Sequence, residues 1–262
     1  MRLPIYQVDA FADRVFDGNP AAVVPLQAWL PESAMLSIAA ENNLAETAFF
    51  VPEGDGFGLR WFTPAVEVPL CGHATLASAF VLMTILEPGR TKVRFSSKSG
   101  PLDVTRAGDL FALDFPSRTL EPCKPGDAEK VAAALGGKPV SVQFSTDRFM
   151  ALYATAAEVR ALRPDLRALL GAGTGRAIAT APGDDCDFVS RFFAPGVGID
   201  EDPVTGSSHC TLVPYWAARL GKTKLLARQV GPRGGTLHCE HAGARTVMAG
   251  AAKLYLEGAI HV

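Results

Sequence analysis

The sequence contains one short pattern twice, half a chain apart. Residues 60–64 (RWFTP) are repeated as residues 191–195 (RFFAP) in a chain of 262 residues. Each copy is followed by an apolar stretch that glycine opens, at Gly72 in the first half and at Gly206 in the second. A duplication of this size predicts two similar lobes that face one another, with the ligand-binding cleft between them.

The two halves differ at a position that matters for chemistry. The first half has Glu46, whereas the same offset in the second half falls on Ala177. One lobe is therefore expected to carry an acid/base group that the other lacks.

Composition limits the class of protein. With 48% hydrophobic and 20% charged residues, the chain has enough apolar residues for ordinary cores. A net charge of −2 gives no reason to expect a nucleic acid or membrane partner. The N-terminus lacks the apolar core of a signal peptide, and the five scattered cysteines form no Cys-x-x-Cys pair. We therefore expect reduced thiols, a cytoplasmic protein and no structural zinc.

Periodicity and turn residues predict α+β lobes, each with strands around one buried helix, rather than a Rossmann sheet. The expected lobes are residues 1–116, joined by a C-terminal strand at about 251–262, and residues 126–250, with a Pro-rich linker at 116–126. Expected strands are 5–10, 21–24, 46–51, 58–62, several within 92–115, 140–144, 149–153, 177–181 and 188–193. Expected helices are 31–42, 72–86, a mostly helical 156–170, and 206–220. Pro214 lies inside the last of these, where it removes a backbone bond and should bend the axis.

The two glycine-led helix starts are candidate carboxylate sites. First-turn backbone N–H groups have no internal partner, and the helix dipole adds partial positive charge there. Gly72 and Gly206 allow close approach to that backbone, while Thr75 and Ser207 add hydroxyl donors. In the alternative interpretation, the glycines only turn the chain into each helix.

Glu46 is the candidate acid/base group. It begins an expected strand that runs into apolar residues, and partial burial there should raise its pKa. His73 and Asp202 are candidate partners that set its protonation state. Alternatively, Glu46 is an exposed strand end, Asp202 a turn carboxylate and His73 a histidine bonded to local backbone.

Other constellations carry less weight. Cys71 precedes Gly72, where a helix N-terminus lowers a thiol pKa, but a two-base racemase needs a second thiol and the counterpart is Thr205. His238 and His241 would point to opposite faces of a strand, so no metal site is expected. No nucleotide-binding or serine-hydrolase motif is present, and we expect no cofactor.

Several ordered blocks resemble the phenazine-biosynthesis isomerase family (PhzF-like), within the diaminopimelate epimerase-like fold. The matching segments are residues 16–23 (FDGNPAAV), 43–49 (NLAETAF), 60–64 (RWFTP), 71–75 (CGHAT), 201–207 (EDPVTGS) and 233–235 (RGG). Ala45 departs from the family, because Ser often precedes its glutamate.

The resemblance implies two pseudo-symmetric lobes, each a strand barrel around one central helix. It implies that Glu46 moves a proton between carbons of a small carboxylic acid, assisted by His73 and Asp202. Gly72, Gly206 and Ser207 would hold the carboxylate. In the best-known members the substrate is trans-2,3-dihydro-3-hydroxyanthranilate, no metal or organic cofactor takes part, and the proteins are homodimers.

Three functions are open at this point. A cofactor-independent isomerase requires one base and fits the difference between Glu46 and Ala177. An amino-acid racemase or epimerase would use Cys71. A non-catalytic small-carboxylate binding protein would keep the cleft and lose the chemistry. We predict the isomerase.

Overall fold

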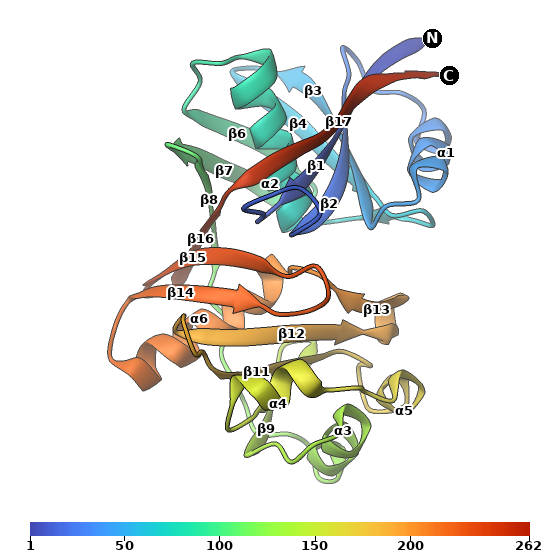
Figure 1. Cartoon of the computed structure of the whole chain (residues 1–262). Coiled ribbons are helices and arrows are strands. Elements are labelled where there is room, and N and C mark those ends of the chain that lie inside the picture. Colours follow the sequence, from blue (N-terminus) through green and yellow to red (C-terminus); the bar gives the residue numbers. More distant parts are fainter. The chain divides into compact units, whose positions relative to one another are not determined.

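The computed structural model describes residues 1–262 and divides the chain into two compact units (Figure 1). Unit 1 comprises Met1–Asp114 and Ala249–Val262, so the C-terminal strand belongs to the unit that contains the N-terminus. Unit 2 comprises Phe115–Met248. The segment 116–126, expected to be a linker, lies within unit 2. None of the helices is both long and apolar enough to cross a membrane.

Unit 1 is built from strands and two α-helices. The strands are β1 (Arg2–Ala10), β2 (Asn19–Pro25), β3 (Glu46–Glu53), β4 (Gly56–Phe62), β5 (Glu67–Val68), β6 (Lys92–Ser97), β7 (Gly100–Ala107), β8 (Leu110–Pro116) and β17 (Ala252–His261), and the helices are α1 (Glu32–Asn42) and α2 (Gly72–Phe80). Strands pair in the order β17–β1–β2–β3–β4–β6–β7–β8, with the short β5 beside the end of β4. The β2–β3 and β4–β6 pairs are parallel and the others antiparallel.

The centre of unit 1 is α2, which the strands surround (Figure 1). Every residue from His73 to Ala79 is buried, as the apolar sequence around the whole helix predicts. Helix α1 covers another face of the sheet through Met35, Ile38 and Ala39. Asn43 ends α1 in the left-handed conformation, which asparagine tolerates.

The predicted helix 72–86 is α-helical only as far as Phe80. Val81–Leu86 continues as a π-helix, in which the Glu87 N–H bonds the Leu82 carbonyl five residues back at 2.7 Å. Hydrophobic periodicity gives almost no warning of this change, because π-turns differ from α-turns in hydrogen-bond spacing rather than in residue type.

Unit 2 repeats the same plan with additional helices. Its strands are β9 (Ser141–Ser145), β10 (Arg148–Leu152), β11 (Ala177–Pro182), β12 (Phe188–Ala194), β13 (Ile199–Asp202), β14 (Lys224–Gln229), β15 (Gly235–Ala242) and β16 (Arg245–Gly250), and its helices are α3 (Asp127–Leu135), α4 (Ala156–Ala161), α5 (Leu166–Leu170) and α6 (Gly206–Leu220). The parallel pairs β10–β11 and β12–β14 correspond to β2–β3 and β4–β6. The buried α6 corresponds to α2.

Side chains repeat as well as strands. In each unit an arginine binds a glutamate with two parallel hydrogen bonds: Arg60 with Glu67, at 2.8 and 2.7 Å, and Arg191 with Glu201, at 2.7 and 2.8 Å. Both arginines belong to the duplicated pattern in the sequence. The duplication therefore preserves a structural ion pair in each unit.

Two predictions in unit 2 need correction. The helix expected over 156–170 is two short helices, because Pro164 has no N–H and disfavours helical backbone at the residue before it. Helix α3 was not predicted at all. The helix-forming residues between Gly126 and Gly136 could have predicted this helix, but the Pro-rich segment directly before them drew the interpretation toward a linker.

Pro214 has a structural explanation. Helix α6 runs through it without interruption, and the carbonyl that Pro214 leaves unbonded is that of Cys210, four residues earlier. The backbone N–H of Arg118 donates to this carbonyl at 2.8 Å. The carbonyl that Pro214 leaves free thus accepts a hydrogen bond from the Pro-rich segment of unit 2.

The α+β class predicted from the sequence is confirmed.

Candidate active site

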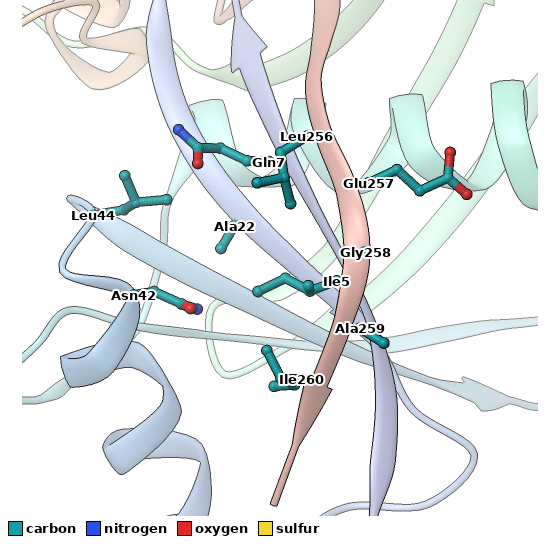
Figure 2. A pocket seen from close by; sticks show the side chains of 10 residues that line it. All are labelled: Ile5, Gln7, Ala22, Asn42, Leu44, Leu256, Glu257, Gly258, Ala259 and Ile260. Carbon is teal, nitrogen blue, oxygen red and sulfur yellow. The ribbon is translucent and has the colours of Figure 1, made fainter.

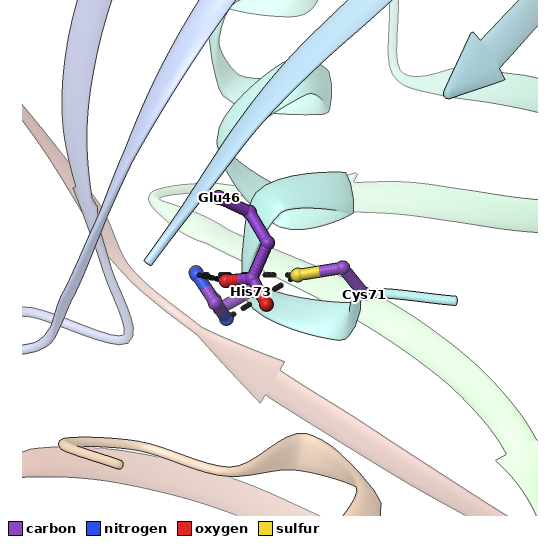
Figure 3. Close-up of side chains that lie close together, drawn as sticks. All are labelled: Glu46, Cys71 and His73. Carbon is purple, nitrogen blue, oxygen red and sulfur yellow. Dashed lines mark hydrogen bonds and ion pairs between the residues drawn. The ribbon is translucent and has the colours of Figure 1, made fainter. Parts of the chain in front are cut away.

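Three titratable side chains of unit 1 gather at the start of α2 (Figure 3). Glu46 is the first residue of β3, His73 lies in the first turn of α2, and Cys71 is the N-cap residue. His73 Nε2 lies 3.2 Å from Glu46 Oε2, with side chains only 7% and 12% exposed. Oε2 of Glu46 is itself buried, so this ion pair is shielded from solvent.

The pKa of Glu46 is lower than the sequence suggested. Burial acts to raise the pKa, as we expected, but the charge of His73 and polar contacts to His73 and Cys71 outweigh burial. The carboxyl is therefore ionised near neutral pH and can act as a base without first losing a proton.

His73 carries the complementary charge. Burial acts to lower its pKa, but the negative charge of Glu46 outweighs burial and holds it well above its ordinary value, whereas Cys71, as a neutral thiol, adds a polar contact without charge. On the other side of the ring, the Asn19 amide lies 3.2 Å from Nδ1. Because protonated Nδ1 is a donor, the amide must present its oxygen there, a choice equivalent to rotating the amide by 180°.

Cys71 is a thiol in this environment. Burial and the nearby Glu46 raise its pKa to about 11, overcoming the helix N-terminus that we expected to lower it. Its Sγ lies 3.5 Å from His73 Nδ1. Cys71 is thus a poor base at neutral pH and serves mainly as a buried contact of His73.

The same cluster is the one group with the composition of a metal site. The potential ligand atoms of Glu46, Cys71 and His73 lie within 4.8 Å of one another. A metal there would require a thiolate and a neutral imidazole, whereas the cluster favours a thiol and an imidazolium. A metal ion would therefore have to displace the protons of both Cys71 and His73 to bind there.

The predicted residues of unit 2 lie at the start of α6. Gly206 is its first residue, Ser207 follows it half-buried, and Asp202 ends β13 just before the helix. The Thr205 hydroxyl donates to Asp202 Oδ2 at 2.5 Å, and the Thr205 N–H donates to Gln229 Oε1 at 2.9 Å. These bonds fix the approach to the helix and leave its first turn without a capping side chain.

The Thr75 hydroxyl is engaged within α2. The residue is fully buried, and its Oγ1 donates to the Cys71 carbonyl at 2.6 Å within α2. The binding of substrate by Thr75 stays a prediction from the sequence. Gly72, at the first position of α2, has no capping side chain before it, so its helix start remains a candidate for binding an anion.

A separate pocket of about 390 Å³ lies in unit 1 (Figure 2). Its lining is mostly apolar and comes from β1, β2, β17 and the segment after α1, including Ile5, Leu44 and Ile260. None of the predicted site residues lines it. The candidate chemistry is instead at the helix starts.

Comparison with known proteins places this geometry in a family. The family model described as phenazine biosynthesis-like protein (PhzC-PhzF) matches residues 8–258. The chain belongs to this family. An uncharacterized isomerase of Pseudomonas aeruginosa is 49% identical over 262 residues, with 100% of both chains covered. The crystal structure of an Enterococcus faecalis PhzF family protein is 46% identical, with a TM-score of 0.94 and 100% of both chains covered.

More distant similarity supports the fold alone. A predicted epimerase of Pseudomonas aeruginosa is 22% identical, with a TM-score of 0.77 and 99% of each chain covered. The resemblance drawn from the sequence blocks is confirmed by the family match, and the predicted class of enzyme, an isomerase, agrees with the naming of the relatives.

Sequence reasoning missed the partners of the site residues. Asn19 was named only as part of the block FDGNPAAV, and Arg148 and Gln229 were not singled out as contacts. Asn19 lies 54 residues from His73, and Gln229 lies 24 residues from Thr205. The block FDGNPAAV contained the signal for Asn19, since its asparagine is buried at the start of β2.

We expect two buried histidines to titrate in opposite directions. His73 should be an imidazolium at pH 6.5, whereas burial lowers the pKa of His209 to about 4, so that His209 stays neutral with Nδ1 donating to the Thr205 carbonyl. Imidazole 15N NMR distinguishes the two forms.

The stability that His73 contributes is full below its unfolded pKa of about 6.5 and is lost as pH rises through its higher folded pKa. For His209, stability is lost as pH falls below 6.5 toward its folded value. A neutral His73 at pH 6.5 would contradict the assigned ion pair.

Proposed function

We propose that the protein is an isomerase that moves a proton between two carbons of a small unsaturated carboxylic acid, with Glu46 carrying the proton. The observation behind this proposal is the buried Glu46–His73 pair in unit 1 together with Ala177 in unit 2. Glu46 and Ala177 each begin a strand that pairs in parallel with the strand before it. Inverting a stereocentre by proton transfer requires a base on each face of the carbon, whereas a shift along one face requires a single base.

The proposed step conserves atoms and electrons. The Glu46 carboxylate takes a proton from carbon, and the electron pair of the broken C–H bond enters the conjugated system that leads to the substrate carboxylate. A new C–H bond then forms at another carbon with the proton from Glu46. While Glu46 is neutral, the positive charge of His73 stabilises the negative charge that develops on the substrate.

In this proposal, backbone N–H groups and a serine hydroxyl bind the substrate carboxylate. The first turn of α6, at Gly206 and Ser207, offers N–H groups that no side chain caps and the positive end of the helix dipole. Gly72 offers the same features at α2. Asp202 is an accessory group in the reaction, with a carboxylate oriented by the Thr205 hydroxyl.

The racemase that would use Cys71 is not proposed. Its thiol has a pKa of about 11, and Thr205 stands at the corresponding N-cap of α6. A homodimer and a cytoplasmic location remain predictions from the sequence.

Proton NMR of the protein with trans-2,3-dihydro-3-hydroxyanthranilate in D2O tests the reaction. We expect the ring double bonds to shift, with deuterium at the carbon that receives the proton to the extent that Glu46 exchanges with solvent. If this compound is unchanged, the same assay is applied to other unsaturated carboxylic acids. Exchange at the α-carbon of an amino acid, with inversion and without any double-bond shift, would contradict the proposal and favour an epimerase.

A further inference from the structure

Arg148, the first residue of β10, is a buried arginine that contacts the start of α6. It is only 5% exposed, and its guanidinium lies over the Phe192 ring at 4.9 Å. Its Nε and Nη2 donate to the Asp147 carboxylate at 2.8 and 3.1 Å. Its Nη1 donates to Ser207 Oγ at 2.9 Å and to Ser208 Oγ at 3.2 Å. Together these contacts fix the position of the Arg148 guanidinium beside the first turn of α6.

The direction of these bonds determines what Ser207 can do. A guanidinium only donates, so both serine oxygens accept from Arg148 and keep their own hydroxyl hydrogens for other acceptors. Ser208 is buried, whereas Ser207 is half-buried. Ser207 is therefore held with a hydroxyl available as a donor, beside uncapped N–H groups of the helix.

The charge around Arg148 favours an anion. The carboxylate of Asp147 is shared with Arg118 at 3.2 Å and Arg176 at 2.6 Å, so three guanidinium groups surround one carboxylate. Burial acts to raise the pKa of Asp147, but Arg148 and the other arginines outweigh burial and lower it, which keeps the carboxylate ionised. One negative charge therefore faces three positive charges next to the positive end of α6.

The duplication gives this arrangement a counterpart in unit 1. The register pairs Ala21 with Glu46 and Phe149 with Ala177, so the beginnings of β2 and β10 are equivalent. By this register Arg148 is equivalent to Pro20 and Asn19 to Asp147, so the contacts of Asn19 with His73 and of Arg148 with Ser207 come from neighbouring positions, not from the same position. His73 and Ser207 each follow the glycine that opens the central helix of their unit. Each unit thus uses a polar side chain at the start of an equivalent strand to hold the side chain after that glycine.

We propose that Arg148 is a positioning residue of a carboxylate subsite in unit 2, which holds the Ser207 hydroxyl as a donor and makes the start of α6 more positive. The inference rests on the proposed function in that the substrate carboxylate binds there. It adds a determinant that the sequence blocks do not contain.

The first test compares Arg148→Lys with Ser207→Ala and with the double variant. Lysine keeps the charge but lacks the planar fork that binds Asp147 and Ser207 together. We expect each single variant to raise the KM for the isomerised acid, and the Kd for benzoate measured by NMR titration, by about tenfold to a hundredfold. The kcat should change less than the KM, by under about threefold, because the carboxylate already carries a full negative charge in the ground state and most of this binding is lost from both states. If Arg148 acts through Ser207, the double variant should bind benzoate no more weakly than the single variant that binds it more weakly.

Arg176→Gln is the matched control. It removes a guanidinium from the same Asp147 carboxylate without touching Ser207, so we expect only a small rise in Kd, within about threefold. Additive effects in the double variant, or an unchanged benzoate Kd in Arg148→Lys, would overturn the positioning role.

The variant Asp147→Asn distinguishes the orientation of Ser207 by Arg148 from the effect of local charge on anion binding. It also provides a test if Arg148→Lys does not fold. If Arg148 acts by orienting Ser207, loss of its anchor weakens benzoate binding. If only charge matters, removal of the Asp147 charge tightens binding, which would overturn the inference.

Benzoate binding also distinguishes the two proposals. Arg148-dependent binding without any isomerisation would refute the proposed reaction but support the carboxylate subsite. Wild-type protein that does not bind benzoate would count against the subsite itself.

Discussion

Replacing Glu46 with glutamine is expected to reduce kcat by about 10²- to 10⁴-fold, the usual contribution of a positioned general acid or base. Glutamine matches the shape of glutamate but cannot accept a proton from carbon. The Glu46 side chain is buried against His73, so the variant also removes the negative charge that holds the pKa of His73 high. Single-turnover kinetics with the substrate identified in D2O would measure the loss of the chemical step.

Two further measurements make this prediction specific. In Glu46→Gln the 15N signal of His73 should change to the neutral form near pH 6.5, because burial then dominates its pKa. Cys71→Ser serves as the comparison variant, since a buried thiol with a pKa of about 11 is not the base in this proposal. We expect Cys71→Ser to retain activity within about tenfold, far above Glu46→Gln. Equal losses in the two variants would contradict the assignment of Glu46.

Truncating Arg191 to alanine is expected to lower the free energy of unfolding of unit 2 by about 3–5 kcal/mol. The guanidinium is buried, with its side chain 7% exposed, and binds Glu201 through two bonds. Its Nη1 also donates to the carbonyls of Val159, Arg160 and Leu162, at 3.2, 3.4 and 2.9 Å, at the C-terminal end of α4. Alanine would leave Glu201 without its partner and these carbonyls without their donor.

The duplication provides a matched control for Arg191. Arg60 makes the same two-bond contact with Glu67, but its side chain is 21% exposed and its second partner, Glu32, is 66% exposed. Arg60→Ala is expected to cost about 1–3 kcal/mol. Urea unfolding gives the overall loss, and hydrogen exchange of the β4 and β12 amides assigns each loss to its unit. A loss for Arg60→Ala as large as that for Arg191→Ala would show that the helix carbonyls contribute little.

Local sequence was sufficient for the elements with strong periodicity. The buried helix at 206–220 and the first residues of β3 and β11 agree with the structure, since burial around a whole helix and short apolar strands leave clear patterns. The repeated RWFTP-like block correctly indicated duplication, and the spacing already gave Ala177 as the position equivalent to Glu46. The family was also readable, because its blocks remain in order along the chain.

Tertiary structure decided the electrostatics of the site and the use of its polar groups. Burial alone predicts a raised pKa for Glu46, and only the position of His73, 27 residues away, reverses the direction. The bond from Arg118 to the carbonyl freed by Pro214, and the bond from Arg148 to Ser207, join segments far apart in the chain. Sequence patterns record which side chains are apolar and where the backbone turns, which are local properties. Hydrogen-bond partners and pKa values depend on distances of a few ångströms between remote residues, which exist only after the chain has folded.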